Sequence, residues 1–357
     1  MGGNLFQTIK QGIYPSWLRR YGRLASTTTM SGMSVSSSAK PGPALIIGCT
    51  GQDGYYLSKS LASDEVECIG VSRSGISFQG RSVVDPLNIL DAVAVSKLIA
   101  DCRPSEIYYL AAHHRSSEDP PETVSESLEK SYDTHVQGLV NVLDGIRDEF
   151  PESRLFYAAS SHVFGNPPSS PQNEETPFLP INVYGITKAA GVQLCRLYRR
   201  THGIHCSAGI LYNHESPRRS PSFVGRKIVR AAVAIKDKKR DKLILGDLSA
   251  EIDWGAAVDY VEAMRAILRL EVPDDFVIAS GELHSIGAFV EIVFDRLNLN
   301  SKDHVEIEPG LITKPSQAQR LVGDARKLRV ATGWQPRMSF EQVIHSMVEA
   351  ELAGKAV

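Results

Sequence analysis

A short apolar run that ends in a glycine-rich turn constrains the fold of this chain more than any other feature. Ala44–Gly48 is continuously apolar, as expected of a strand buried on both faces, and the turn Gly48-Cys-Thr-Gly51-Gln-Asp-Gly54 leads from it into a helical pattern over Tyr55–Leu61. In such strand–turn–helix units one glycine permits a tight turn, another lets the backbone approach a pyrophosphate and a third allows close helix packing. The segment therefore predicts a dinucleotide site, with a glycine turn that binds no ligand as the alternative.

Apolar runs and helical patterns continue to alternate after this turn. Further strands are predicted at Val66–Val71, Arg81–Val84, Glu106–Ala112, Arg154–Ala159 and His205–Leu211. Further helices are predicted at Ala92–Ala100, Ser131–Phe150 and Val183–His202. Such alternation predicts an α/β protein with a doubly wound parallel sheet, a Rossmann fold, and right-handed crossovers. Past Asn213 the alternation loosens, which indicates a smaller mixed α/β C-terminal subdomain.

Charge and composition separate a leader from the body of the chain. Residues 1–52 contain no Asp or Glu but five Lys or Arg, and Ser26–Ser38 is almost entirely Ser, Thr, Gly and Met. This composition predicts a disordered leader over residues 1–42, or a transit peptide for import into a mitochondrion or plastid. We expect an NADP-binding Rossmann domain over 43–215, continued by about 256–281, and a substrate-binding subdomain over 216–255 and 282–357.

The overall composition excludes several classes of protein. With 42% hydrophobic and 22% charged residues, the chain can bury a sizeable core and is not disordered overall. Its net charge of −2 gives no electrostatic reason to expect nucleic acid, and no apolar run reaches the roughly 18 residues of a membrane-spanning helix. The five cysteines never form a Cys-x-x-Cys pair, which argues against a disulfide framework or a structural zinc site. We therefore predict a soluble protein of a reducing compartment such as the cytoplasm.

The end of the second predicted strand bears on the form of the cofactor. Val71 is followed by Ser72-Arg73-Ser74 without a carboxylate, and Arg81 follows nearby. A carboxylate at this place accepts a hydrogen bond from a ribose 2′-hydroxyl, whereas an arginine accommodates a 2′-phosphate. The sequence thus favours NADP over NAD, unless Arg73 is only a solvated surface charge. Asp85 is placed either to meet the adenine edge or to cap the next helix.

Three polar side chains predict oxidoreductase chemistry. Tyr184 and Lys188 lie at positions i and i+4, on one face of a predicted helix. Because a nearby cation favours phenolate, we expect Lys188 to lower the pKa of Tyr184. Ser160 stands at the carboxyl end of a predicted strand, where ligand crevices open in such sheets. This set can move a proton while a hydride passes to nicotinamide.

Further motifs carry a resemblance to a known family. They are Thr50–Gly54, Pro171–Pro177, Gly209–Arg219, Asp253–Gly255, Asp259–Met264 and Gly333–Pro336. Over about residues 44–350 the chain resembles the extended short-chain dehydrogenase/reductases, and within them the GDP-mannose 4,6-dehydratases. The resemblance implies bound NADP(H), a GDP-hexose substrate and a homodimer or homotetramer. Family chemistry oxidises C4 of the sugar, eliminates water across C5 and C6, and returns the hydride to C6.

The motifs and the resemblance together assign site residues. The catalytic positions are Ser160, His162, Tyr184 and Lys188. Cofactor contacts are expected from Gly48, Thr50, Gly51, Gln52, Asp53, Gly54, Arg73, Asp85, Leu110, Ala111, Tyr184, Lys188, His214 and Arg219. Substrate contacts are expected from His113, Ser161, Asn213, Lys227 and Lys314.

The chain also departs from the family pattern. The family places a Glu two residues after the catalytic Ser or Thr, where it handles the C5 proton and the leaving hydroxyl; here that position is His162. Ala112–Ser117 replaces a family Gln-Ser-His, Glu251-Ile252 replaces a basic pair, and Lys314–Gln317 replaces an Arg-Pro-Thr-Glu. The cofactor and redox parts match, while the elimination and substrate parts have partly changed.

These departures leave alternatives open. Neutral His162 either acts as the base at C5, since imidazole titrates near neutral pH, or only shapes the pocket. The chain is then a GDP-hexose 4,6-dehydratase, or a C4 epimerase or 4-keto reductase that needs only the Ser-Tyr-Lys set. A catalytically silent dinucleotide-binding protein is disfavoured because all three of those residues are kept.

Two pairs of neighbouring residues have competing interpretations. His113 and His114 are candidates for binding a sugar or phosphate, and no metal is expected because no third ligand lies at a recognisable spacing. Arg218 and Arg219 hold a phosphate, reach a neighbouring subunit's cofactor, or are solvated.

Overall fold

A six-stranded parallel sheet forms the centre of the larger part of the molecule. The computed structural model describes residues 42–73, 87–116, 119–311 and 320–354. The sheet has the order β2-β1-β3-β4-β5-β9, and every neighbouring pair is parallel. Its strands are β1 (Ala44–Ile47), β2 (Cys68–Val71), β3 (Glu106–Tyr109), β4 (Arg154–Ser160), β5 (Cys206–Leu211) and β9 (Asp275–Ile278). The predicted doubly wound sheet is confirmed, while the predicted strand Arg81–Val84 lies outside the described residues.

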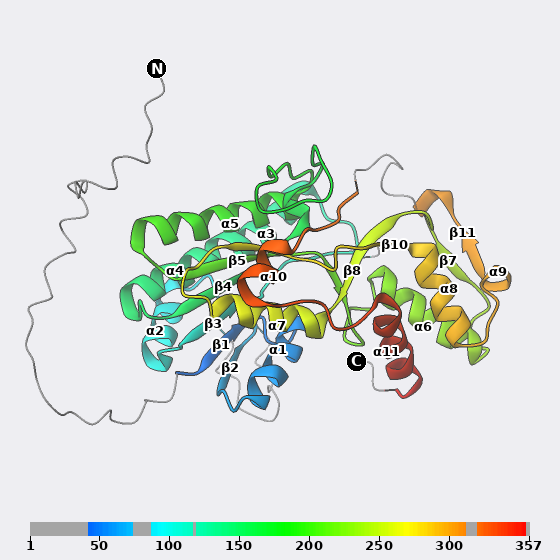
Figure 1. Ribbon diagram of the computed structural model, residues 1–357, viewed down its shortest axis with the longest axis horizontal. Coiled ribbons are helices and arrows are strands. Elements are labelled where there is room, and N and C mark those ends of the chain that lie inside the picture. The colour runs from blue at the N-terminus through cyan, green and yellow to red at the C-terminus, as the bar shows by residue number, and fades with distance from the viewer. Residues whose placement is uncertain (1–41, 74–86, 117–118, 312–319, 355–357) are drawn as a thin grey trace, which may run out of the picture. The chain divides into compact units, whose positions relative to one another are not determined.

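Helices cover both faces of this sheet (Figure 1). On one face lie α1 (Gln52–Ser63) and α7 (Ala257–Leu268), and on the other lie α2 (Ala92–Cys102), α4 (Gly138–Glu149) and α5 (Val183–His202). Side chains alternate between the two faces along each strand, so Ala44 and Ile46 pack under the first pair of helices while Leu45 and Ile47 pack under the others. Burial on both faces explains why these strands are continuously apolar.

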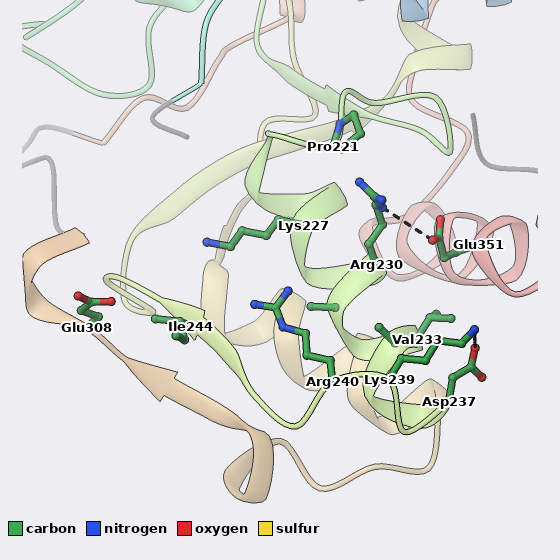
Figure 2. A pocket seen from close by; sticks show the side chains of 12 residues that line it. Pro221, Lys227, Arg230, Val233, Asp237, Lys239, Arg240, Ile244, Glu308 and Glu351 are labelled. Carbon is green, nitrogen blue, oxygen red and sulfur yellow. Dashed lines mark hydrogen bonds and ion pairs between the residues drawn. The ribbon is translucent and has the colours of Figure 1, made fainter. Parts of the chain in front are cut away.

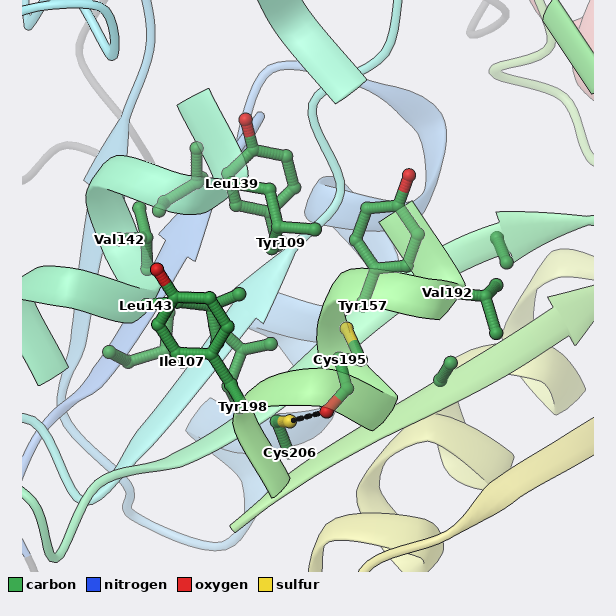
Figure 3. Packing of buried hydrophobic residues seen from close by; sticks show 14 of the residues in the cluster. Ile107, Tyr109, Leu139, Val142, Leu143, Tyr157, Val192, Cys195, Tyr198 and Cys206 are labelled. Carbon is green, nitrogen blue, oxygen red and sulfur yellow. Dashed lines mark hydrogen bonds between the residues drawn. The ribbon is translucent and has the colours of Figure 1, made fainter. Parts of the chain in front are cut away.

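The core under α4 and α5 contains aromatic side chains as well as aliphatic ones (Figure 3). Tyr109 and Tyr157 are fully buried, with ring centres 6.0 Å apart. Cys206 donates through Sγ to the carbonyl of Cys195 at 3.0 Å, and all five cysteines are free thiols. The core is therefore held by packing without a disulfide.

The long predicted helix Ser131–Phe150 proves to be the second half of a longer helical segment. The longer segment starts with α3 (Val124–Tyr132), where Thr123 and Glu126 form a capping box. It continues through a π-helical turn, η3 (Asp133–Gln137), into α4. A π-turn inserts one residue into the helical register and is often found at functional sites. Here it directs His135 toward α5.

Most of the remaining described elements form a smaller mixed α/β region. Three strands pair in the order β10-β8-β6, and β7 pairs in parallel with β11. These strands are β6 (Asn213–Glu215), β7 (Leu243–Leu245), β8 (Glu251–Ala256), β10 (Leu283–Ser285) and β11 (Val305–Ile307). The helices of this region are α6 (Val224–Lys236), α8 (Ile286–Arg296), α9 (Ser301–His304) and α11 (Phe340–Leu352), with the 3₁₀ turn η5 (Pro309–Leu311). Two further elements pack with the large sheet instead: the 3₁₀ turn η4 (Ser161–Val163) lies against α5, and α10 (Arg326–Thr332) lies against β9 and α7.

This smaller region has an apolar core of its own. Side chains from α6, α8 and α11 pack around Trp254 of β8, whose ring stacks on Phe340 at 5.4 Å. Within the described ranges, none of the helices is long and apolar enough to cross a membrane. The predicted leader over residues 1–42 lies almost wholly outside those ranges.

Candidate active site

The predicted catalytic and glycine-turn residues come together at the carboxyl edge of the six-stranded sheet. The glycine turn follows β1, Ser160 is the last residue of β4, and Tyr184 and Lys188 lie in the first turns of α5. The carboxyl ends of parallel strands face one edge, so residues more than a hundred positions apart in sequence meet there. This is the edge at which ligands bind in open α/β sheets.

The glycine turn has the shape that an approaching phosphate requires. Gly48 has φ of +93°, and a Cβ added there would lie 2.8 Å from the backbone nitrogen of Ala111. A Cβ on Gly54 would lie 2.6 Å from the carbonyl oxygen of Cys49, which fixes the close packing of α1 on the turn. A Cβ on Gly51 would lie at an ordinary contact distance, 3.4 Å, from the carbonyl oxygen of Gly48, and no described side chain caps the N-terminus of α1 that Gly51 begins. The N–H groups of that first turn are thus available to an anion.

Asp53 and His214 form an ion pair beside this turn. Both carboxylate oxygens of Asp53 lie 3.0 Å from His214 Nε2, and His214 Nδ1 lies 2.8 Å from the carbonyl oxygen of Tyr212. Since both ring nitrogens face acceptors, both carry protons and the imidazole is a cation. Burial opposes charge on each group, but the pair interaction prevails: the pKa of His214 is raised and that of Asp53 is lowered.

Gln52 adds further bonds between the start of α1 and the strand β6. Its amide nitrogen donates to the carbonyl of His214 at 3.1 Å, and its amide oxygen accepts from Ser216 Oγ at 2.7 Å. Gln52, Asp53 and His214 are all predicted to contact the cofactor. Gln52 thus bonds to the backbone of His214, and Asp53 bonds to its ring. These bonds fix the N-terminus of α1 against β6 and the segment after it.

Ser160 and Tyr184 are in direct contact. The hydroxyl of Ser160 is hydrogen-bonded to the phenol of Tyr184. Burial raises the pKa of Tyr184 to about 12, and the bond to Ser160 and the charge of Arg219 oppose this only in part. The predicted lowering of this pKa by Lys188 is wrong, because the cost of desolvating a phenolate outweighs the neighbouring cation.

Lys188 is almost completely buried, with 1% of its surface exposed. Its Nζ donates to the carbonyl of Ala158 at 2.7 Å and lies 5.8 Å from the centre of the Tyr184 ring. Burial lowers the pKa of Lys188 to about 7, although Asp53 acts in the opposite direction. Both protonation states of this amine are therefore populated near neutral pH, so it is able to accept a proton as well as to donate one.

His162 lies next to the Ser–Tyr pair, on the 3₁₀ turn η4. Its backbone N–H donates to Ser160 Oγ at 3.3 Å, and its ring is perpendicular to the ring of Tyr184 with centres 5.5 Å apart. Its Nδ1 is 3.1 Å from the amide nitrogen of Asn182, the N-cap residue of α5. The sequence did not predict the role of Asn182, because nothing in an N-cap asparagine indicates that its side chain also contacts a histidine.

His114 covers the ring of Tyr184 from another side. The two rings stack with centres 4.6 Å apart, and Phe223 lies 4.9 Å from the imidazole. His114 is partly exposed to solvent. Desolvation by the surrounding protein nevertheless lowers its pKa well below the usual value, and the positive charge of Arg219 adds to this effect. His114 is therefore neutral at physiological pH and offers a flat polar surface at the crevice.

His135 supports Tyr184 from inside the protein and was also missed by sequence reasoning. It is fully buried, and its ring lies 5.3 Å from that of Tyr184. Its Nε2 accepts the backbone N–H of His113 at 3.0 Å, so Nδ1 carries the proton and donates to Thr187 Oγ1 at 2.8 Å. Burial lowers the pKa of His135 far below the usual value. The only sequence signal was an isolated histidine in a helical pattern.

The side chain of His113, a predicted substrate contact, is held by its own loop. Its Nε2 lies 3.0 Å from Glu122, which also binds Lys130 at 2.8 Å and Arg115 at 3.4 Å. The bonds from Lys130 and His113 lower the pKa of Glu122 to about 2. The loop after β3 and helix α3 thus share a carboxylate–cation cluster around Glu122.

The predicted arginines lie in two loops, one after β2 and one between β6 and α6. Arg73 is exposed directly after β2. Arg218 lies over the ring of Tyr55 at 4.1 Å, and Arg219 lies over Phe223 at 3.9 Å with its Nε 3.4 Å from Glu215. Arg219 is thereby placed near Tyr184, because Phe223 lies beside His114 and His114 stacks on the Tyr184 ring.

Some of the other residues that we predicted to contact cofactor or substrate lie at the site, and others do not. Leu110 and Ala111 lie where β3 meets the glycine turn, Thr50 is exposed in that turn, and Ser161 is buried in η4. Asn213 begins β6, opposite Trp254 of β8. Asp85 and Lys314 lie outside the described residues, within which no cluster of three or more metal-ligating side chains occurs.

Lys227 stands apart, in a groove of about 770 Å³ over α6 (Figure 2). Arg230 and Arg240 line the same groove, and Glu351 pairs with Arg230 at 4.0 Å. The groove is thus lined by both cations and carboxylates.

Asp253, from a motif that carried the resemblance, has a bracing role. Its carboxylate accepts the backbone N–H groups of Ser280, Gly281 and Gly323 at 3.0 to 3.1 Å. Two loops distant in sequence, at Ser280–Gly281 and at Gly323, are joined to β8 through this one buried side chain.

Comparisons with known proteins identify the family. The family described as GDP-mannose 4,6 dehydratase matches residues 45–347. The chain belongs to this family. GDP-mannose 4,6 dehydratase 2 of Arabidopsis thaliana is 37% identical over 331 residues, which cover 87% of this chain and 86% of that relative. The predicted resemblance to the GDP-mannose 4,6-dehydratases, and so to the extended short-chain dehydrogenase/reductase enzymes, is confirmed.

Solved structures of lower identity share the fold of this GDP-mannose 4,6-dehydratase family member. The UDP-glucose 4-epimerase of Thermotoga maritima, solved with UDP-glucose, has a TM-score of 0.75 and 17% identity, covering 87% of this chain and 99% of that one. The dTDP-glucose 4,6-dehydratase of Bacillus anthracis, in complex with NAD, has a TM-score of 0.74 and 20% identity over 88% and 97%. An epimerase and a dehydratase thus have the same fold, so side chains must distinguish the reactions.

Proposed function

We propose that this protein is an NADP-dependent enzyme that converts a GDP-hexose through a 4-keto intermediate, by GDP-mannose 4,6-dehydratase chemistry. The observation that carries the proposal is the meeting of Ser160, Tyr184 and Lys188 beside the open glycine turn. Family membership supports the GDP-hexose substrate. The domain division predicted from the sequence, with a cofactor half and a substrate half, belongs to this proposal.

The glycine turn and Arg73 are the groups that would hold the cofactor. The exposed Gly51 and the uncapped first turn of α1 fit a pyrophosphate, and the exposed guanidinium after β2 fits a 2′-phosphate. When bound, NADP supplies the acceptor for the hydride that leaves C4 of the sugar. The form with the 2′-phosphate is favoured because Ser72-Arg73-Ser74 offers no carboxylate.

The protein's own groups would manage the proton at O4. Tyr184 takes the hydroxyl proton as the C4–H bond breaks, and Ser160 holds the same oxygen through its hydroxyl. Since the pKa of Tyr184 is about 12, the phenolate needs a partner that removes or compensates the charge. Lys188, with a pKa of about 7, is able to protonate and deprotonate for this purpose at neutral pH. The reverse transfers return a proton when the carbonyl is reduced.

A second candidate function rests on His162. A C4 epimerase or 4-keto reductase needs only Ser160, Tyr184 and Lys188, whereas elimination also needs a group that removes the C5 proton. An imidazole stands where the resemblance implies a carboxylate. This observation favours a reaction that retains oxygen at C6.

The experiment that tests the proposal uses GDP-mannose carrying deuterium at C4, with NADP and the purified protein. C4 oxidation predicts that deuterium leaves C4, and mass and NMR then read its destination. Deuterium at C6 with loss of water gives the dehydratase, whereas changed configuration at C4 with O6 retained gives the second candidate. Unchanged substrate across a panel of GDP-, UDP- and dTDP-hexoses, with NADP still bound, would support a silent dinucleotide-binding protein.

We also propose a homodimer or homotetramer. The support is a stripe of exposed apolar side chains along α3, comprising Val124, Leu128 and Tyr132. Sedimentation of the intact protein measures the number of subunits, and a monomer at micromolar concentration would reject this part.

A further inference from the structure

We infer that Asn182 fixes His162 in the neutral tautomer with the proton on Nε2, so that His162 meets the substrate as a hydrogen-bond donor and not as a base. The inference rests on the proposed function, because it concerns the step that follows C4 oxidation. It assigns Asn182 as a positioning residue that determines how readily the enzyme proceeds from a 4-keto sugar to loss of water.

The orientation of the Asn182 amide follows from its place at the start of α5. Its Oδ1 accepts the backbone N–H of Gly185 at 2.8 Å, the usual bond of an asparagine N-cap. With Oδ1 committed to the helix, Nδ2 is the atom that faces His162 Nδ1 at 3.1 Å. An amide NH₂ only donates, so Nδ1 must accept, and a neutral imidazole then carries its proton on Nε2. Protonation of Nδ1 as well would set two donors against each other.

Packing keeps these two residues together. A Cβ on Gly185 would lie 2.4 Å from the carbonyl oxygen of His162, so glycine allows the first turn of α5 to press directly on η4. The other end of that turn is tied by the bond from His162 N–H to Ser160 Oγ. The His162 ring is thereby held within 5.5 Å of the Tyr184 ring, at the edge where the sugar would react.

The tautomer decides what His162 can do to a sugar. In a 4-keto hexose the carbonyl acidifies the C5–H bond. Elimination then passes that proton to a base, forms C5=C6 with the electron pair of the C–H bond, and breaks C6–O6 with release of water once O6 has been protonated. A base needs a lone pair aimed at the sugar, but the lone pair of this tautomer is on Nδ1 and is occupied by Asn182. Nε2 carries the proton in this tautomer and offers no lone pair to the sugar.

Two consequences follow for the native enzyme. The first is that hydride transfer at C4 runs faster than removal of the C5 proton. The second is that an acceptor in place of the Asn182 NH₂ group reverses the tautomer and frees a lone pair on Nε2. Asn182→Asp makes this change while keeping an N-cap oxygen for Gly185, since aspartate caps helices as well as asparagine does. Asn182→Ser is the matched control, because serine also caps but is too short to hold the imidazole.

The tautomer is measured directly by ¹⁵N NMR of the histidine-labelled full-length protein, with His162 assigned from the signal lost in His162→Gln. We expect one protonated and one unprotonated ring nitrogen in the native protein, with the proton on Nε2, and the opposite pattern in Asn182→Asp. Native His162 protonated on Nδ1 would overturn the inference. This measurement needs no activity, so it remains decisive even if the proposed function fails.

The chemical consequence is measured with C4-deuterated GDP-mannose and NADP in ordinary water. The rate of deuterium loss from C4 is compared with the rate of water loss, read as a product 18 mass units lighter. Asn182→Asp is expected to raise the ratio of water loss to C4 oxidation on the order of 10²-fold, within the contribution of a positioned base. Asn182→Ser is expected to leave it within a few-fold of native. An unchanged ratio in an Asn182→Asp protein whose tautomer has switched would overturn the catalytic part. Absence of any C4 oxidation in the native protein would instead count against the proposed function.

Discussion

The two sides of the site, the glycine turn and the surroundings of Tyr184, use the same residue type in different charge states. On the side of the glycine turn, His214 lies between a carboxylate and a carbonyl, so both of its nitrogens are protonated. On the side of Tyr184, His162 faces an amide NH₂ and His135 faces a backbone N–H, so each keeps one nitrogen unprotonated. The difference teaches that partner atoms, more than burial alone, decide the state of a histidine. The first side thus holds a buried ion pair, and the second side holds neutral imidazoles around Tyr184.

Tyr184→Phe tests whether proton transfer depends on the Tyr184 side of the site and cofactor binding on the glycine turn. Removing the phenolic oxygen should reduce kcat by about 10²–10⁴-fold, the usual contribution of a positioned acid or base. NADP affinity should change little, because the glycine turn is untouched. Steady-state turnover and binding titrations measure the two effects separately. Native turnover in this variant would reject the assignment of Tyr184.

Asp53→Asn tests the electrostatic role of the first side. Leaving a buried imidazolium without its carboxylate should lower the free energy of unfolding by about 3 kcal/mol at pH 6. Because the pKa of His214 is raised, its contribution is fully present below about pH 6.5 and is lost as pH rises through the raised value. Because the pKa of Asp53 is lowered, the contribution of this carboxylate to stability is present above about pH 3.9. It is lost as the pH falls through the lowered pKa.

Denaturant unfolding between pH 4 and 9 measures this dependence. The advantage of the native protein over Asp53→Asn should stay level from pH 4 to about pH 6.5 and should fall as the pH rises through the raised pKa of His214. A difference that is independent of pH would show that the pair is not ionised.

Lys188→Met tests how much the burial of this amine lowers the stability of the protein. Between pH 7 and 10.5 the unfolded chain binds more protons than the folded one, so native stability should rise with pH over this interval. An apolar side chain of similar length should raise the free energy of unfolding by about 1–3 kcal/mol at pH 7 and abolish that slope, while turnover is lost. Lys97→Met, at an exposed site, is the control and should change neither. A destabilised Lys188→Met protein would contradict the lowered pKa.

Arg73→Ala concerns cofactor choice on the first side and has the smallest expected effect. Loss of one exposed guanidinium should weaken NADP binding about tenfold, while NAD binding changes by less than a factor of about two. Arg200→Ala, an exposed arginine on α5, is the matched control. Equal losses for both dinucleotides would remove Arg73 from the 2′-phosphate role.

Local patterns in the sequence predicted the parts of the site that depend on local structure. The glycine spacing after β1 and the i, i+4 relation of Tyr184 and Lys188 are properties of one turn and one helix. The pairing of Asp53 with His214 joins residues 161 positions apart, and the contact of Asn182 with His162 depends on how α5 packs on η4. No periodicity encodes such contacts.

One electrostatic expectation was wrong for a physical reason. A lysine four residues from a tyrosine predicts a lower tyrosine pKa when both are solvated. Burial of both residues raises the cost of forming charge on either, so the pKa of Tyr184 rises and that of Lys188 falls. Burial of this extent is set by the tertiary fold and is not visible in the spacing.

The most direct test of the account is rapid mixing of the protein and NADP with GDP-mannose, followed by the near-ultraviolet absorbance of reduced nicotinamide. The account predicts a transient rise in this absorbance in the native protein and none in Tyr184→Phe. Sugar conversion without any reduced nicotinamide, or the same transient in both proteins, would contradict it.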